Sequence, residues 1–176
     1  MAYQKLQVGL GLEVIPTDGS DIPNPAGPSF SSTGTTGTVA TGAVLTLVDT
    51  AADFIKEGIK PGMVIYNTVD NCVAVVTSVT DANTLLAGVK SGITWTSSSP
   101  YTIFHETTDG CVLYVGGELA AGVSGLDLTI VTSSGSDVQL QKLLPGSFLP
   151  IQVRRVKETG TDTDTAGSYV KVVAFW

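Results

Sequence analysis

Hydrophobic and polar residues alternate with a period of two along most of this chain, a pattern that is typical of strands. The alternation begins near the N-terminus and predicts a strand within residues 1–15, with one face formed by Leu6, Val8, Leu10, Leu12 and Val14. Further apolar runs predict strands at residues 39–48, 63–68, 72–79, 84–89, 101–104, 111–115, 126–131, 149–156 and 169–176, and a return strand from 138. Gly, Pro, Asn and Asp separate these runs, so we expect a mainly β protein.

One segment departs from this period and predicts a short helix over residues 50–58. Thr50 and Asp53 are spaced like the start of a capping box, and Gly58 stands where a C-terminal cap would fall. Pro61 then forbids continuation of the helix. The buried face of this helix would consist of Phe54, Ile55 and Ile59.

A proline-rich arm, residues 16–28, follows the first predicted strand. Its four prolines remove backbone donors and fix φ, so neither a strand ladder nor a helix can run through it. Residues 29–42 are rich in Ser, Thr and Gly and continue the break. Two interpretations of the arm are open. It packs on its own domain, or it lies across a neighbouring subunit, where a pre-extended segment loses less entropy on docking.

A second candidate for binding is the basic pair Arg154 and Arg155. On a regular strand Arg155 would share a face with Val153 and Ile151, and Arg154 would point the other way. The pair either forms one ion pair and one exposed charge, or contacts an acidic partner through its planar guanidinium groups.

Aromatic residues are scarce, and four of them are candidates for an interface because such rings bury much area. These are Trp95, Tyr101, Phe175 and Trp176. A place in the core is an equal alternative for Tyr101 and Phe175. From the arm, the basic pair and these aromatic residues, the interface candidates that we select are Pro16, Asp18, Asp21, Pro23, Asn24, Pro25, Pro28, Arg154, Arg155 and Trp176.

Composition supports the β interpretation and excludes two classes of partner. Charged residues make up 14% and hydrophobic residues 43% of the 176 residues, which predicts a folded globular chain. The formal net charge is -7, whereas phosphate backbones and anionic membranes are recognised by Lys and Arg. We therefore expect no nucleic-acid and no membrane partner. The first residues also lack the continuous apolar region of a signal peptide.

Residues that perform catalysis or bind metals are sparse. His105 is the only histidine, and neither a Gly-x-Ser-x-Gly elbow nor a phosphate-binding glycine loop is present. The aspartates within residues 18–21 and 162–164 are too few for a calcium loop. Cys72 and Cys111 fit no metal spacing, and we expect two buried, reduced thiols. The sequence predicts no catalytic residue, no cofactor and no metal, and hence no enzyme.

Several short motifs occur in a fixed order in the arm and the C-terminal half. They are VIPTDGSDIPNPA at residues 14–26, GCVLYVGG at 110–117, LDLTIV at 126–131, PGSFLPIQVRRV at 145–156, TGT at 159–161 and VVA at 172–174. In this order they resemble the small head-associated spike-base proteins of tailed bacteriophages and gene transfer agents. The resemblance covers about half of the chain.

This resemblance implies a small β-sandwich or barrel-like domain made of residues 1–28 and 109–176. In those proteins the arm leads almost directly into the strand that corresponds to residues 111–115, whereas residues 29–108 intervene here. The simplest account is a module inserted at a surface loop, where insertions are tolerated best. We expect that module to be a small barrel-like β unit with the one short helix, and the host domain to be discontinuous.

The resemblance also implies a function. The chain would be a non-enzymatic virion protein that binds the phage head as a decoration, cement or spike-base subunit, and so stabilises the capsid or anchors a fibre. Its partners would be the major capsid protein, copies of itself in a trimer or pentamer, and a fibre or spike protein. We expect it on the outer surface of the head, after synthesis in the host cytoplasm. Two alternatives are a structural role in the tail, adaptor or baseplate, and a virion module that binds a glycan or receptor.

Overall fold

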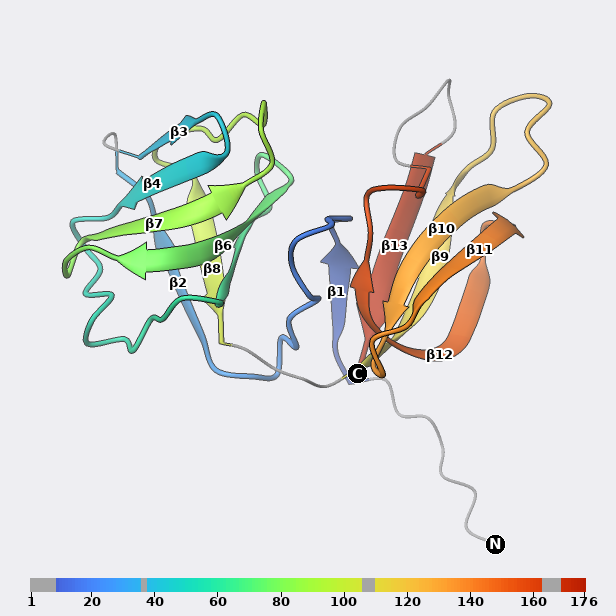
Figure 1. Cartoon of the computed structure of the whole chain (residues 1–176), viewed down its shortest axis with the longest axis horizontal. Coiled ribbons are helices and arrows are strands. Elements are labelled where there is room, and N and C mark those ends of the chain that lie inside the picture. Colours follow the sequence, from blue (N-terminus) through green and yellow to red (C-terminus); the bar gives the residue numbers. More distant parts are fainter. Residues whose placement is uncertain (1–8, 36–37, 106–109, 163–168) are drawn as a thin grey trace, which may run out of the picture. The chain divides into compact units, whose positions relative to one another are not determined.

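Antiparallel strands make up the structure, a computed structural model that describes residues 9–35, 38–105, 110–162 and 169–176 (Figure 1). Within these residues there is no helix, and so none that could span a membrane. The mainly β prediction is therefore confirmed. The short helix predicted for residues 50–58 is wrong.

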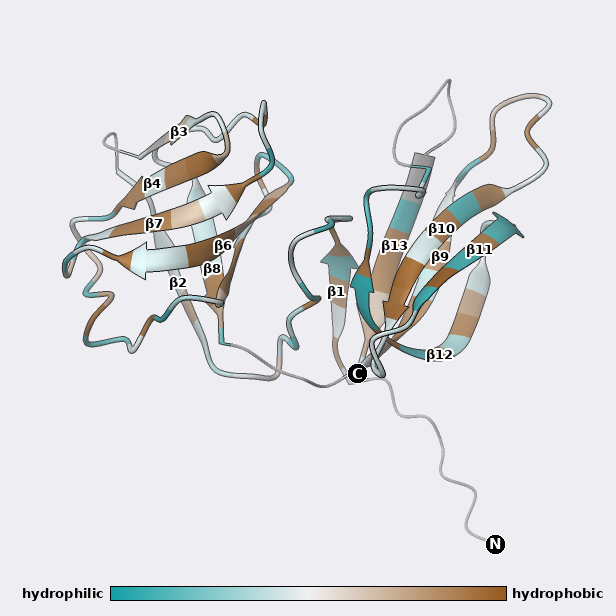
Figure 2. Ribbon diagram, viewed as in Figure 1, coloured by the Kyte–Doolittle hydropathy of each residue, from teal (hydrophilic) through white to brown (hydrophobic). Residues whose placement is uncertain are grey.

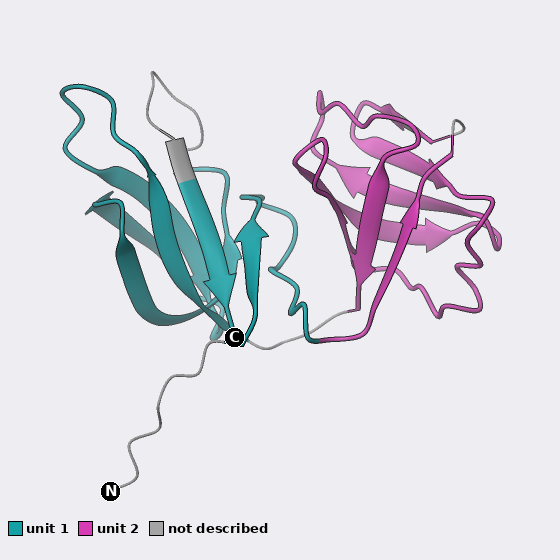
Figure 3. Cartoon of the chain, turned by 180° about the vertical axis from the view of Figure 1, so that it is seen from behind, with its two compact units in different colours: residues 1–26, 108–176 teal, residues 27–107 magenta. Residues whose placement is uncertain are grey.

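The chain divides into two compact units (Figure 3). Unit 1 consists of residues 1–26 and 108–176, and unit 2 consists of residues 27–107. Each unit has one sheet and one hydrophobic core of its own. Unit 2 thus interrupts the sequence of unit 1 without sharing its sheet.

Unit 1 is a six-stranded sheet that pairs an N-terminal strand with the last one. Its strands are β1 (Gly11–Val14), β9 (Cys111–Glu118), β10 (Leu126–Thr132), β11 (Asp137–Leu143), β12 (Ser147–Val156) and β13 (Tyr169–Phe175). Their order across the sheet is β1-β13-β9-β12-β10-β11, and all neighbours are antiparallel. Of the strand predicted within residues 1–15, the structure shows β1, and residues 1–8 lie outside the described part of the chain.

Alternate residues of this sheet form the core of unit 1, and Figure 2 shows the resulting alternation of apolar and polar residues along β10. Leu113 and Val115 of β9 are fully buried, as are Leu128 and Ile130 of β10. Strands near both edges of the sheet contribute to one core, so the sheet curls around it. Ile22 of the arm, with 4% of its surface exposed, packs into the same core.

Strand β12 is irregular in the centre of this sheet. Its register shifts against β9 between Leu149 and Val153, which is where Pro150 lies. A proline has no N–H to donate to a ladder, so within a sheet it is confined to edges and bulges. A second shift occurs in the pairing of β12 with β10, and it leaves Val153 and Val156 both buried. The two residues between them therefore do not alternate between faces as a regular strand would require.

Unit 2 is a seven-stranded antiparallel sheet. Its strands are β2 (Ser29–Thr33), β3 (Val39–Thr41), β4 (Val44–Val48), β5 (Val64–Asn67), β6 (Cys72–Val79), β7 (Thr84–Val89) and β8 (Pro100–Phe104). Their order is β2-β8-β5-β6-β7-β4-β3. After β2 the chain returns to β4, where the Thr35 amide donates to the Val48 carbonyl at 2.7 Å and the Thr38 hydroxyl donates to the same carbonyl at 2.9 Å. These bonds connect the two edges of the sheet at one end.

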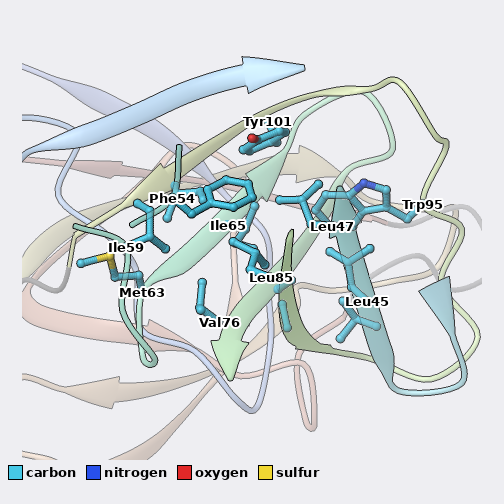
Figure 4. Packing of buried hydrophobic residues seen from close by; sticks show 14 of the residues in the cluster. Leu45, Leu47, Phe54, Ile59, Met63, Ile65, Val76, Leu85, Trp95 and Tyr101 are labelled. Carbon is cyan, nitrogen blue, oxygen red and sulfur yellow. The ribbon is translucent and has the colours of Figure 1, made fainter. Parts of the chain in front are cut away.

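The core of unit 2 is enclosed by this curved sheet and centres on Phe54 (Figure 4). Phe54 is fully buried, and its ring meets the ring of Phe30 edge-on with centroids 6.2 Å apart. The other large side chains of this core include Leu45, Leu47, Ile59, Met63, Ile65, Val76, Leu85, Trp95, Tyr101 and Ile103. Most of them come from strands, so unit 2 does not need a helix to cover its core.

Residues 50–58 form successive turns in place of the predicted helix. Asp53 caps a single turn: its Oδ1 accepts from the Lys56 amide at 3.0 Å, and its carbonyl accepts from the Glu57 amide at 2.9 Å. The turn ends at once, because Gly58 adopts a φ of 71°, which reverses the chain. One turn satisfies too few backbone groups to form a helix.

The buried face predicted for this segment is only partly correct. Phe54 and Ile59 are buried, and the Ile59 amide bonds back to the Phe54 carbonyl at 2.9 Å. Ile55, in contrast, is 66% exposed, so its predicted place in the buried face is wrong. A single turn presents no continuous stripe to the core, and neighbouring residues therefore point in different directions.

Two strand boundaries also differ from the prediction. The single strand predicted over residues 39–48 is a hairpin, β3 and β4, in which Thr41 is paired with Val44. Gly42 has a φ of 63°, as the first position of a two-residue hairpin turn requires. Ser29–Thr33, at the start of the Ser-, Thr- and Gly-rich segment that was predicted to continue the break, form β2, which pairs along its whole length with β8.

A buried polar pair links the segment after β4 to β8. Asp49 is fully buried and accepts the Tyr101 hydroxyl proton at 2.7 Å. Burial raises the pKa of Tyr101, and its bond to the carboxylate raises it further. For Asp49, burial acts to raise the pKa, but hydrogen bonds from the Ser32 and Tyr101 hydroxyls and from the following backbone amides hold it below its usual value.

Replacing Tyr101 by Phe is expected to destabilise unit 2 by about 1–3 kcal/mol, because the buried Asp49 carboxylate loses a donor. A carboxylate with a lowered folded-state pKa stabilises the fold above its unfolded pKa of about 3.9, and this stability is lost as the pH falls through the folded value. The Tyr101→Phe variant should therefore lose this stability at a higher pH than the wild type. Urea unfolding at a series of pH values measures both effects.

Tyr114→Phe is the matched control, because no hydrogen bond to the Tyr114 hydroxyl exists among the described residues. Its free energy of unfolding should change by less than about 0.5 kcal/mol. Equal losses in Tyr101→Phe and Tyr114→Phe would contradict the role assigned to the buried pair.

Candidate functional site

The arm that follows β1 lies along β12 of its own unit. The Thr17 amide donates to the Val156 carbonyl at 2.9 Å, and the Ile22 amide donates to the Arg154 carbonyl at 2.7 Å. Of the two interpretations of the arm, the first therefore holds for this part: it packs on its own domain. A contact with a neighbouring subunit stays a prediction.

The arm residues singled out from the sequence differ in how far they are exposed. Pro23 is buried, whereas Asp18 and Pro28 are exposed. The remaining four, half-buried, are Pro16, Asp21, Asn24 and Pro25. The Asn24 side chain turns the chain, because its Oδ1 accepts from the Ala26 amide at 2.8 Å. Pro28 belongs to unit 2, and the other arm candidates belong to unit 1.

Asp21 lies against both arginines of β12. The Arg155 Nε donates to Asp21 Oδ1 at 2.7 Å, and its Nη2 lies 2.6 Å from the same oxygen. Arg155 Nη1 also donates to the Asp18 carbonyl at 2.8 Å. Arg154 Nε lies 3.9 Å from the other Asp21 oxygen, an ion pair without a hydrogen bond. The prediction that the arginines point to opposite faces is wrong here, because the irregular register of β12 brings both to one carboxylate.

Asp18 is held by the residues that follow β12. Its carboxylate accepts the Thr159 hydroxyl proton at 2.7 Å and the Thr159 amide proton at 3.1 Å. The side-chain bond from Thr159 is the largest influence on Asp18 and, with the amide bonds, lowers its pKa against a smaller opposing effect of burial. We call Asp18, Asp21, Arg154, Arg155 and Thr159 the clasp.

The segment that presents Thr159 is itself fixed to β10. The Thr129 amide donates to the Thr161 hydroxyl at 3.0 Å, and the Thr129 hydroxyl donates to the Gly160 carbonyl at 2.9 Å. Gly160 has a φ of 80°, and a Cβ there would lie 2.6 Å from the Thr129 hydroxyl. Only glycine fits this position without displacing its neighbours. The Thr-Gly-Thr motif therefore gives the clasp a rigid support.

The side chains of the clasp join the arm to β12 and to the segment that follows it. Its carboxylates accept hydrogen bonds from guanidinium, hydroxyl and amide donors. Within the described residues no group of three or more His, Cys, Asp or Glu could hold a metal.

The cysteines and the histidine lie outside the clasp. Burial raises the pKa of Cys72 and of Cys111 to about 12, so both thiols are protonated at neutral pH. His105 is half-buried, and its amide donates to the Pro28 carbonyl at 3.0 Å. A non-enzymatic role stays a prediction.

The aromatic candidates are divided between core and surface. Trp95 and Tyr101 are 7% and 3% exposed in the core of unit 2, which removes them from any surface of the folded unit. Trp176 is half-buried and packs against the core of unit 1. Its backbone exchanges hydrogen bonds with residues 9 and 10 at 3.0 and 3.2 Å, and thereby extends the pairing of β1 with β13.

A surface cluster of aromatic rings contains Phe175, which was an interface candidate, and two residues that the sequence analysis missed, Tyr114 and Phe148. Phe148 of β12 is 55% exposed, and its ring lies 5.2 Å from that of Tyr114 and 6.0 Å from that of Phe175. The available signal was the alternation itself: Tyr114 lies between two buried residues of β9 and Phe148 precedes the buried Leu149, positions that should be polar if that face were only solvated.

Replacing Arg155 by Ala is expected to loosen the arm, because Asp21 loses its two closest donors. These groups are partly exposed, so the loss in free energy of unfolding should be about 1–2 kcal/mol. The amides of Thr17 and Ile22 should exchange hydrogen faster, as measured by NMR. Lys157→Ala is the control, since its ion pair lies outside the arm. Similar acceleration in both variants would show that the clasp does not hold the arm.

Replacing Thr159 by Val is expected to raise the pKa of Asp18 towards its usual value, because the largest stabiliser of the ionised form is removed. The shift can be followed by NMR titration of the carboxyl carbon. Asp70 in unit 2 serves as an internal reference, since its lowered pKa depends on Asn67, Thr96 and Ser99 instead. An unchanged Asp18 titration would contradict the hydrogen bonds described.

Comparisons with known proteins assign no family to this chain. No protein-family model, no curated protein and no solved structure matches it. What the chain does is therefore inferred from its clasped arm, its two units and the places that its sequence motifs occupy in the fold.

Proposed function

We propose that this chain is a non-enzymatic structural protein of a tailed phage or gene transfer agent particle. It binds the outer surface of the head as a decoration, cement or spike-base subunit. There it stabilises the shell or anchors a fibre. Its partners are the major capsid protein and further copies of itself.

The observation that supports this proposal most is where the resembling motifs lie. The arm motif at residues 14–26, β9, β10, β12, the Thr-Gly-Thr segment and β13 all belong to unit 1. The residues from 29 to 107, which have no counterpart in that resemblance, belong to unit 2. A chance set of short matches would have no reason to coincide with one compact unit and to exclude the other.

The contacts within unit 1 fit an attachment role. The Asp-rich arm and the Leu-Pro-Ile-x-Val-x-x-Val strand are held together by Asp21, Arg154 and Arg155, so two of the resembling motifs form one rigid surface. A rigid surface loses little conformational entropy when it docks. The proposal therefore assigns the contact with the shell to unit 1.

Unit 2 would then supply a second, separate function of the subunit. The strands of unit 2 pair only with one another, and the unit has its own core. Its fold therefore does not depend on what unit 1 contacts. On the head such a unit suits a bound fibre or spike protein, or additional cover over the shell. This assignment follows from the division of the chain and not from any site in unit 2.

The test is to locate and rebind the protein. Mass spectrometry of purified particles should detect the chain, and gold-labelled antibodies should mark the heads. Purified protein should co-sediment in a saturable manner with heads that lack it, and complete particles, whose positions are filled, should bind much less. Label on the tail would overturn the head assignment in favour of the tail, adaptor or baseplate alternative. Absence from particles would overturn the proposal as a whole.

A further inference from the structure

One face of the unit 1 sheet is partly apolar, and the described strands of unit 1 all lie in the sheet itself, so none of them covers this face. We call it the aromatic face and define it by Tyr114 of β9, Phe148 of β12 and Phe175 of β13. These residues alternate with the core residues Leu113, Leu149 and Ala174, so they point away from the core of unit 1.

The three rings form one continuous cluster across three neighbouring strands. Tyr114 is directly opposite Phe148 in the register of β9 and β12. Phe148 and Phe175 stack with an interplanar angle of 26° and ring centroids 6.0 Å apart. The ring of Phe175 also covers Gly11 of β1, where a Cβ would lie 3.0 Å from it. The aromatic face thus extends to the edge strand.

The other half of the same sheet behaves differently on its outward side. There β10 and β11 place Thr129 opposite Gln139, and Asp137 opposite Val131, which is buried. An antiparallel sheet with one solvated face normally alternates apolar inward and polar outward residues, and this half largely does so. The aromatic face departs from that rule, and Phe148 remains 55% exposed. An exposed aromatic cluster of this kind marks an interaction surface.

The charges around the aromatic face favour another copy of the chain as its partner. The whole chain has a net charge of -7, so two copies repel each other over most of their surfaces. The charged residues next to the rings are Glu13 and Lys171, which pair at 3.3 Å and cancel, and Glu118 at the end of β9. The face is nearly neutral, so two copies can approach it without repulsion, and the Lys171 ammonium of one copy can lie near a carboxylate of the other. A strongly charged partner would have no group of opposite charge to pair with there.

We propose that the aromatic face is a contact surface between copies of this chain. Two sheet faces can pack on each other about 10 Å apart, with the rings of one copy placed between those of the next. Phe148, the most exposed of the three, lies at the centre of the contact. The inference deepens the proposed function, because it names the surface by which subunits on the particle contact one another, and its place in the virion depends on that proposal.

Sedimentation velocity over a wide range of protein concentration tests the contact. The wild-type protein should associate reversibly, and Phe148→Ser should raise the dissociation constant at least about tenfold, the effect of losing a central aromatic contact. Ile55→Ser is the matched control, since Ile55 is 66% exposed in unit 2 and lies outside the aromatic face. It should leave the dissociation constant unchanged. A protein that stays monomeric at every concentration, or one whose association ignores Phe148→Ser, would overturn the inference.

Cross-linking provides a second measurement, which reports the proximity of two side chains in the contact and not its dissociation constant. Cys72 and Cys111 are buried, so a Phe148→Cys variant adds one accessible thiol. Mild oxidation should link two copies through position 148, and an Ile55→Cys variant should link far less. If self-association is absent while wild-type protein still rebinds heads and Phe148→Ser does not, the face contacts the shell and the inference fails. In that case the virion role stands, so the two proposals fail separately.

Discussion

The pairing of β1 with β13 is the constraint on which unit 1 depends. It joins segments near the two ends of the chain, and the arm that follows β1 continues from it to β12, where the Thr17 and Ile22 amides donate to backbone carbonyls. Doubling a loop costs only about 0.6 kcal/mol in closure entropy. Burial of one side chain such as Val14 contributes about 1.5–3 kcal/mol, so the interruption by unit 2 is readily offset. Folding of unit 2 also shortens the loop, because its first and last strands are neighbours.

Strand β12 determines where the arm is held. It pairs with β9 over its first part and with β10 over its last, and the irregular stretch between these parts begins at Pro150. The change of register brings Arg154 and Arg155 to the arm while Phe148 remains on the opposite side of the bulge, at the aromatic face. Strand β12 thus supplies both the arginines of the clasp and the residue proposed for the contact between copies. A distortion of the strand at one of these places would therefore affect the other.

Periodicity predicted the β class and most strands, because a period of two is visible wherever one face is buried. It failed where local geometry breaks the period. A single glycine, Gly42, converts one predicted strand into a hairpin, and Gly58 ends the predicted helix after one turn. The clasp was found only in part: its residues were named, but the contact of Arg155 with Asp21 depends on a bulge that no local pattern reveals. Of the ring cluster only Phe175 was named, since its members are distant in sequence and no local pattern joins them.

The neighbouring positions of β2 and β8 have a consequence for how such chains diversify. Ser29 of β2 lies opposite Phe104 of β8, at the spacing of about 5 Å between paired strands, so unit 2 begins and ends at nearly the same place and requires the same of the position where it is inserted. Any folded unit whose ends lie equally close together meets the same requirement. The junction is therefore a natural position for recombination between genes. For protein engineering it is an insertion site for an enzyme, an epitope or a binding domain.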